Sequence, residues 1–247
     1  MFTGMHSNFQ GQPRKLLVQA NRNGFFYVLD RTNGKVLLAK PFVKKLNWAR
    51  AILPNGRPDV IVDTDPTTTG RVTCPGVKGA SNWFSPSYNP ETGLFYVMTI
   101  EQCDMYMTSA RPYNKSECYD GTGAEPVPAE PGQFLLRAID IQNGEIRWEI
   151  PMVVKDTMEP WPGTVSTAGG LVFFGDNEGY LSAADSRTGK VLWHFNTGQS
   201  ISASPMTYSV KGKQFVTLAT GGDIFTFGLF RPMLPAAVNV KERYEGK

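Results

Sequence analysis

Few side chains of this 247-residue chain are of a type and spacing that suit chemistry. Asp63 and Asp65 form an Asp-x-Asp pair, which suggests a cation site. No third oxygen ligand follows at a suitable spacing, so we interpret the pair as loop capping. His6 and His194 are unpaired in sequence, and a histidine at a strand end, such as His194, is usually structural. These residues do not make up a catalytic set.

Arg22 lies in a segment whose structure the sequence predicts more clearly. Asn21-Arg22-Asn23-Gly24 joins two apolar runs, Lys15–Ala20 and Phe25–Asp30. Asn-Gly between such runs is a strong signal for a tight β-hairpin turn. We therefore expect Arg22 at a turn near one end of the strands. On this local evidence alone, the guanidinium is interpreted as a solvated turn residue.

The three cysteines do not settle the redox compartment. Cys103 and Cys118 flank a polar stretch and are candidates for a disulfide that closes a loop. That bridge would imply an oxidising compartment and would leave Cys74 single. The alternative, with no such bridge, stays open. Asn114-Lys115-Ser116 has the form of a glycosylation acceptor, but one match to so short a pattern is weak evidence.

Composition favours a β-rich protein and excludes some function classes. Hydrophobic residues make up 41% and aromatic residues 12%, and 25 Gly and 18 Pro are enough for many short strands and turns. The net charge is only +3, and the Lys and Arg residues are scattered, so nucleic-acid binding gains no support. No apolar run approaches the roughly 20 residues of a membrane span. The first residues lack the basic and apolar regions of a signal peptide.

A repeated hairpin organises the chain. The stretch AADSRTGKVLW (183–193) returns as AIDIQNGEIRW (138–148) and, more weakly, as VLDRTNGKVLL (28–38). In each copy an Asp is followed four residues later by Gly and eight residues later by a large apolar residue. The Asp can accept backbone N–H bonds, the Gly can take the positive φ that closes the turn, and a Trp suits a seam between repeats.

The spacing of the repeats predicts the fold class. Asp140 and Asp185 are 45 positions apart, which is the length of one four-stranded propeller blade. Asp30 and Asp140 are 110 positions apart, which fits two such periods plus an insertion. We therefore predict an all-β protein, a β-propeller of four-stranded antiparallel blades that forms about half of a seven- or eight-bladed ring.

The blades are expected in a definite order. We predict a partial first blade, two full blades and a partial last one, all within residues 1–230, followed by a C-terminal tail (231–247). The other expectations are a loop at 1–14, irregular chain at 41–81, a loop inserted within a blade at 103–132, four strands within 164–196 and three within 201–228.

Several segments, taken together, resemble one family, the quinoprotein alcohol dehydrogenases, which depend on pyrroloquinoline quinone (PQQ). That family has an eight-bladed propeller with an A-x-D-x-x-T-G-K-x-x-W tryptophan-docking repeat. Beside the repeats, the similar segments are Asn21–Gly24, Gly79–Trp83, Pro160–Gly163 with Thr167–Phe173, and Ser204–Tyr208. The resemblance runs over nearly the whole chain, in order, and corresponds to the C-terminal half of the family's propeller.

The resemblance implies a role for three residues in holding PQQ. Arg22 is expected to contact the quinone oxygens, Asn82 to form a hydrogen bond with the cofactor, and Trp161 to line its pocket. PQQ is a flat trianion, so a fixed guanidinium suits it, as do an amide and an indole. Two structural alternatives stay open: Asn82 as a turn cap and Trp161 as a residue of the seam between blades.

The family's reaction also needs groups that we do not find in this chain. The resemblance implies a Ca²⁺ or lanthanide ion and an Asp base, both from the part of the family's propeller that precedes these residues. Residues 1–21 contain no Asp or Glu. We therefore assign no catalytic residue and no metal ligand here, and we expect the isolated chain to be inactive.

Two functions of different classes follow. The first is an enzyme: a segment of a periplasmic PQQ-dependent alcohol dehydrogenase that oxidises a primary alcohol to an aldehyde, with a cytochrome c as electron acceptor. It would act with the missing N-terminal half or another subunit. The alternative is a non-catalytic propeller that serves as a binding scaffold, as in outer-membrane assembly lipoproteins. A scaffold has no reason to place Arg22, Asn82 and Trp161 together, so the enzyme lineage is favoured.

Overall fold

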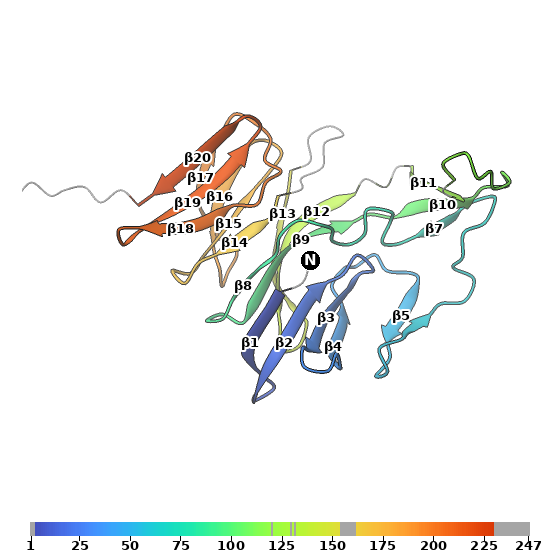
Figure 1. Ribbon diagram of the computed structural model, residues 1–247, viewed down its shortest axis with the longest axis horizontal. Helices are drawn as coiled ribbons and strands as arrows, with labels where there is room; N and C mark the ends of the chain where they lie inside the picture. Colours follow the sequence, from blue (N-terminus) through green and yellow to red (C-terminus); the bar gives the residue numbers. More distant parts are fainter. Residues whose placement is uncertain (1–2, 120, 129, 131, 154–161, 230–247) are drawn as a thin grey trace, which may run out of the picture.

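The computed structural model describes residues 3–119, 121–128, 130, 132–153 and 162–229, and Figure 1 shows their arrangement. All the regular secondary structure in these residues is β-strand, and the strands pair antiparallel. The prediction of an all-β fold is confirmed. The expected tail (231–247) lies outside the described residues.

Four consecutive sheets form the body of the chain, and we call them sheets I to IV. Sheet I contains β1 (Thr3–Phe9), β2 (Gln12–Ala20), β3 (Phe25–Asp30) and β4 (Val36–Pro41). Sheet II contains β8 (Ser87–Asn89), β9 (Leu94–Glu101), β12 (Gln133–Asp140) and β13 (Ile146–Pro151). Sheet III contains β14 (Thr164–Ser166), β15 (Leu171–Gly175), β16 (Tyr180–Asp185) and β17 (Val191–Asn196). Sheet IV contains β18 (Met206–Val210), β19 (Lys213–Thr220) and β20 (Asp223–Gly228).

Within each sheet the strands lie side by side in the order in which the chain meets them. Sheets I to IV follow one another across the molecule in Figure 1. A series of up-and-down sheets stacked face to face is the architecture of propeller blades. Three of the four blades have four strands in the described residues, and sheet IV has three, as predicted for 201–228.

The expectation of a loop at 1–14 and a partial first blade is wrong. Residues Thr3–Phe9 pair with β2 along their whole length, so sheet I is a full blade. Only Met5 and Phe9 of this strand are buried, which leaves too few apolar residues for a visible alternation. Its turn is Gln10-Gly11 rather than Asn-Gly, with both residues at positive φ (49° and 77°), as in a type I′ hairpin.

The two stretches expected to be irregular pair with each other. Residues 41–81 contain β5 (Ala49–Ile52), β6 (Pro58–Val60) and β7 (Arg71–Thr73), and residues 103–132 contain β10 (Asp104–Thr108) and β11 (Thr122–Pro126). Strand β10 lies between β11 and β7 in a three-stranded sheet, which we call the outer sheet. Figure 1 shows it beyond the end of β9. Pairing between strands so far apart in sequence leaves no local period to detect.

The disulfide is not the candidate Cys103–Cys118 bridge. Cys103 is bonded to Cys74 with a Cα–Cα distance of 4.4 Å, and Cys118 is exposed and outside the bond. Cys74 directly follows β7 and Cys103 directly precedes β10, so the bridge lies at the edge of the outer sheet and joins two of its strands. Its partners were hidden because Cys74 and Cys103 meet only through that pairing.

The apolar core lies between the sheets rather than within one of them. One cluster joins sheets I and II through residues such as Phe26, Phe95 and Ile139, and a second joins sheets II and III through residues such as Tyr96 and Phe174. All eight residues of β9 are buried, because this strand is covered on both faces. A strand buried on both faces reads as a continuous apolar run rather than an alternation.

The repeated hairpins share one hydrogen-bond pattern. Gly34, Gly144 and Gly189 have φ of 76°, 71° and 73°, and each donates its N–H to the carbonyl of the Asp four residues earlier. The Asp185 carboxylate accepts the Thr188 hydroxyl and backbone N–H bonds, and these lower the pKa of Asp185 below its usual value. The turn therefore forms from local chemistry, as predicted.

Trp148 lies in the seam between two blades. Its indole Nε1–H donates to the Ser186 carbonyl at 3.1 Å, and its ring centroid lies 5.6 Å from that of Tyr96. The turn of the next repeat faces the same ring, since a Cβ at Gly189 would lie 2.8 Å from Trp148. Trp193, at the equivalent position, is 39% exposed and has the Phe227 ring of sheet IV at 5.4 Å.

A buried ion pair attaches the chain that follows sheet I to sheet II. Arg137 is fully buried and donates from Nη1 to Glu101 Oε1 and to the Phe42 carbonyl, both at 2.7 Å. The Glu101 carboxylate also accepts the backbone N–H groups of Lys44 and Lys45, at 2.8 and 2.9 Å. Removing one partner of such a pair leaves the other charge buried and unpaired, which is strongly destabilising.

We expect Gly189→Ala to destabilise the chain more than Gly34→Ala. Both glycines have positive φ, which costs an L-residue about 1–2 kcal/mol. Only at Gly189 does the added Cβ also meet the Trp148 ring, whereas nothing lies within 4 Å of Gly34. Overpacking of this kind adds about 1–3 kcal/mol. Urea unfolding of the two variants measures the difference, and equal losses would show that Trp148 does not press on the turn.

We also expect the double variant Cys74→Ser/Cys103→Ser to lower the free energy of unfolding by about 3–4 kcal/mol, since the bond closes a loop with a sequence separation of 29. The matched control is Cys118→Ser, at an exposed position, which should change it by less than about 0.5 kcal/mol. A larger loss in the control would mean that Cys118 carries the structural role.

Candidate functional site

Arg22 projects from the rigid turn between β2 and β3. The Asn21 side chain accepts the Asn23 N–H at 3.0 Å, and the Asn23 side chain accepts the Phe25 N–H at 3.0 Å. Gly24 has φ of 92° and lies under apolar side chains, where a Cβ would come within 2.8 Å of Leu46. These bonds fix the backbone of Arg22 at the end of sheet I, as the Asn-Gly signal predicted.

A second segment, residues 76–83, runs beside this turn. The Ala80 N–H donates to the Arg22 carbonyl at 2.9 Å. Gly79 has φ of 75°, and a Cβ there would lie 2.7 Å from the Arg22 Cβ, so the close approach requires glycine. The Arg22 guanidinium in turn donates from Nη2 to the Val77 carbonyl. Backbone and side chain of Arg22 are therefore both held by this segment.

Asn82 is held by the same segment. Its Nδ2 donates to the Lys78 carbonyl at 2.9 Å, which leaves the Oδ1 acceptor for another partner. Lys78 itself is half-buried, and its desolvation lowers its pKa, although the charge of Asp104 acts in the opposite direction. The structural alternative for Asn82, a cap of its own turn, is thus part of its geometry and does not exclude a contact with a ligand.

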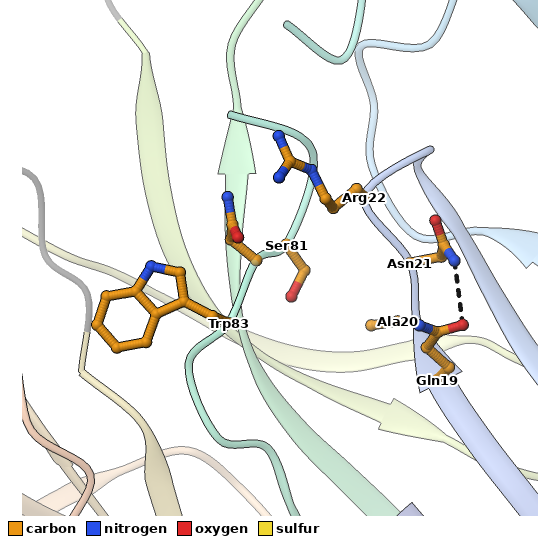
Figure 2. A pocket seen from close by; sticks show the side chains of 7 residues that line it. Gln19, Ala20, Asn21, Arg22, Ser81 and Trp83 are labelled. Carbon is orange, nitrogen blue, oxygen red and sulfur yellow. Dashed lines mark hydrogen bonds between the residues drawn. The ribbon is translucent and has the colours of Figure 1, made fainter. Parts of the chain in front are cut away.

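Arg22 and Asn82 line one pocket of about 250 Å³, shown in Figure 2. The lining residues come from the end of β2, the β2–β3 turn and the 76–83 segment, and they are Gln19, Ala20, Asn21, Arg22, Ser81, Asn82 and Trp83. Arg22 is the single charged side chain among these seven. The pocket therefore favours an anion with oxygens that can accept hydrogen bonds.

Trp83 is a lining residue that sequence reasoning did not single out. Its side chain is 60% exposed although it is the largest in the pocket. Residues 80–86 are not in a strand, so Asn82 and Trp83 can face the pocket in succession, which a strand would forbid. The available signal was the adjacency of the two residues in the segment Gly79–Trp83.

Trp161, the third residue expected at the site, lies outside the described residues. Chain just beyond it is described: the Thr164 N–H donates to the Ser85 carbonyl at 2.8 Å, two residues after Trp83. Among the described residues, no group of three or more His, Cys, Asp or Glu is placed to hold a metal ion. Within the same residues, no helix is long and apolar enough to cross a bilayer.

The fold and pocket define a class: a β-propeller with a pocket, lined by an arginine and an asparagine, at one end of its blades. Residues 129–216 match the family described as glucose/ethanol/alcohol dehydrogenase, beta-propeller domain, of the PQQ type. The chain is 36% identical over 219 residues to the quinoprotein alcohol dehydrogenase PedH of Pseudomonas putida, covering 85% of this chain and 36% of PedH. It is also 36% identical over 229 residues to a lanthanide-dependent methanol dehydrogenase of Methylorubrum extorquens, covering 86% of this chain and 37% of that one.

Solved structures agree. A quinohemoprotein alcohol dehydrogenase from Comamonas testosteroni superposes with a TM-score of 0.79 at 33% identity, covering 90% of this chain and 34% of that one. A europium-containing methanol dehydrogenase superposes with a TM-score of 0.75 at 34% identity, covering 88% and 38%. The chain belongs to the quinoprotein alcohol dehydrogenase family. It spans little more than a third of the length of these relatives.

The described residues fit one side of a PQQ molecule. The guanidinium of Arg22, the amide of Asn82 and the indole of Trp83 match a flat trianion with quinone oxygens. At about 250 Å³ the pocket is smaller than the roughly 300–1,000 Å³ typical of ligand sites. The pocket as described therefore has room for only part of such a ligand.

Proposed function

We propose that this chain is a segment of a PQQ-dependent alcohol dehydrogenase that oxidises a primary alcohol to an aldehyde. The observation that supports it best is the meeting of Arg22 and Asn82 in one pocket, although 60 positions separate them in sequence. When bound, PQQ supplies an electrophilic quinone carbonyl that accepts the hydride of the alcohol carbon. The non-catalytic scaffold is the less favoured alternative, because it gives no reason for this pairing.

The residues of this chain bind and orient the cofactor. The Arg22 guanidinium would hold the quinone oxygens and would stabilise negative charge there, since it is anchored at Val77 and needs little reorganisation. Asn82 would form a hydrogen bond with the cofactor through its side-chain amide, which the Lys78 carbonyl orients. By the resemblance, Trp161 would line the cofactor pocket. A Ca²⁺ or lanthanide ion and the Asp base are supplied by other parts of the enzyme.

The proposed setting is the bacterial periplasm, with a cytochrome c as electron acceptor. The Cys74–Cys103 bond supports an oxidising compartment, where such bonds form and persist. The N-terminal half of the propeller, or another subunit, is the proposed partner that covers the open side of the pocket.

We expect no turnover from the isolated chain. With PQQ, Ca²⁺, ethanol and an electron-acceptor dye, reduction of the dye should stay at the rate seen without protein. The physical reason is that the chain offers one wall of the pocket and spans 36% of PedH. Steady dye reduction that depends on ethanol would contradict the proposal that other parts of the enzyme supply the metal ion and the Asp base.

We expect the isolated chain to bind PQQ weakly, with a Kd above 1 micromolar, and to depend on Arg22 for that binding. Loss of a charge-assisted hydrogen bond is worth about 1.5–3 kcal/mol, so Arg22→Ala should weaken binding roughly 10- to 100-fold. Quenching of tryptophan fluorescence, to which the exposed Trp83 contributes, measures the titration. The matched control is Arg14→Ala, on β2 and outside this pocket. Equal affinity of both variants would remove Arg22 from the site.

A further inference from the structure

Asp104 is a buried carboxylate that takes no part in the pocket itself. It is the first residue of β10 in the outer sheet, and its side chain is 1% exposed. Its Oδ2 accepts the Val77 N–H at 2.7 Å, and its Oδ1 accepts the Gln102 Nε2–H at 3.0 Å. A buried carboxylate needs such partners, and here one of them is the backbone of the segment that supports the site.

The turn that Asp104 holds anchors both polar ends of the site. Gly79 donates its N–H to the Gly76 carbonyl at 2.9 Å, which closes the turn around Val77 and Lys78. The carbonyl of Val77 accepts the Arg22 guanidinium, and the carbonyl of the next residue, Lys78, accepts the Asn82 amide at 2.9 Å. The orientation of the two side chains therefore depends on the orientation of two successive peptide groups.

The packing leaves little freedom at this contact. A Cβ at Gly76 would lie 2.5 Å from Asp104 Oδ2, so the carboxylate occupies the space that any other residue would need. The Gly76 N–H donates to the Gln102 carbonyl at 2.8 Å, and the Cys74–Cys103 bond joins the two segments just beside it. The outer sheet thus clamps the turn from one side.

The Asp104 charge also interacts with the titratable groups around its contact with Val77. Burial raises the pKa of Tyr106, on the same strand, and the Asp104 charge raises it further while the Arg22 charge lowers it. The Asp104 charge also acts on Lys78, against the desolvation that lowers the pKa of that lysine. Asp104 is therefore within electrostatic reach of the turn and of the groups around Arg22.

We propose that Asp104 is a positioning residue for the cofactor pocket: its carboxylate fixes the Gly76–Gly79 turn, whose carbonyls orient the Arg22 guanidinium and the Asn82 amide. The outer sheet then has a role in the site, because it carries Asp104 and the disulfide that holds it in place. That the oriented groups face PQQ rests on the proposed function; that Asp104 orients them does not.

The test begins with the chain in the absence of cofactor, by ¹⁵N NMR and amide hydrogen exchange. In Asp104→Ala the Val77 amide should exchange at least tenfold faster, and the Arg22 Nε–H and Asn82 side-chain amide signals should shift. The Trp148 indole signal should stay in place, because its bond to Ser186 lies in another seam. Asp104→Asn keeps one acceptor oxygen and should restore most of the wild-type pattern, a rescue that a general loss of packing would not show.

If Asp104→Ala does not fold, Gly76→Ala replaces it, since the new methyl group displaces the carboxylate and Gly76 does not have a positive φ. Its matched control is Gly123→Ala on β11, where nothing lies within 4 Å. The same shifts of the Arg22 and Asn82 signals are expected in Gly76→Ala alone. Unmoved signals in a folded variant, with Val77 protected as in wild type, would overturn the proposal.

A PQQ titration separates this proposal from the proposed function. If wild type binds PQQ, Asp104→Ala should weaken the affinity about tenfold, and an unchanged affinity with unmoved Arg22 and Asn82 signals refutes the positioning role. If wild type binds no PQQ while those signals shift in the variant, the positioning role stands and the ligand is wrong.

Discussion

Burial of both faces of the central strands is the constraint on which this structure depends. A single four-stranded sheet of this size cannot bury its own apolar residues, so β9 and β12 are stable only with a neighbouring sheet on each side. The clusters of sheets I with II and of sheets II with III satisfy that requirement. Among the described residues, the cluster between sheets III and IV has three fully buried members, and all residues of β17 are exposed. The burial of sheet faces by neighbouring sheets is therefore less complete for sheets III and IV than for sheets I and II.

The packing of neighbouring blades fixes where the ends of the blades lie, and this in turn fixes the position of the pocket. The turn that carries Arg22 lies at one end of sheet I, and the chain that leads into sheet II passes beside it. There the Ala80 N–H donates to the Arg22 carbonyl, and the Ala80 carbonyl accepts the Ile100 N–H. The site is thus built where two blades meet, from a hairpin turn and a non-repetitive segment. A propeller uses its regular strands for stability and such connecting segments for binding.

The connecting segments are also where local sequence patterns are least informative. Residues 41–81 and 103–132 show no period, yet they form paired strands, a disulfide and the buried contacts of Asp104. The Arg137–Glu101 pair plays a similar part for residues 42–45. In both cases a buried charge satisfies backbone N–H groups of a loop that no strand partner can satisfy.

The sequence by itself determined the features that form within a few residues. The Asp-to-Gly turns of the three repeats, the Asn-Gly turn at Arg22 and the strands between them follow from local hydrogen bonds and permitted φ angles. The resemblance of two segments to the family also predicted that Arg22 and Asn82 share a site, and both line one pocket. Only the tertiary structure decided that Thr3–Phe9 completes a blade and that Cys103 pairs with Cys74. It alone also showed that Val77 and Lys78 hold the two site residues. Those outcomes depend on contacts between segments that are distant in the chain, and such contacts leave no period or spacing in the sequence.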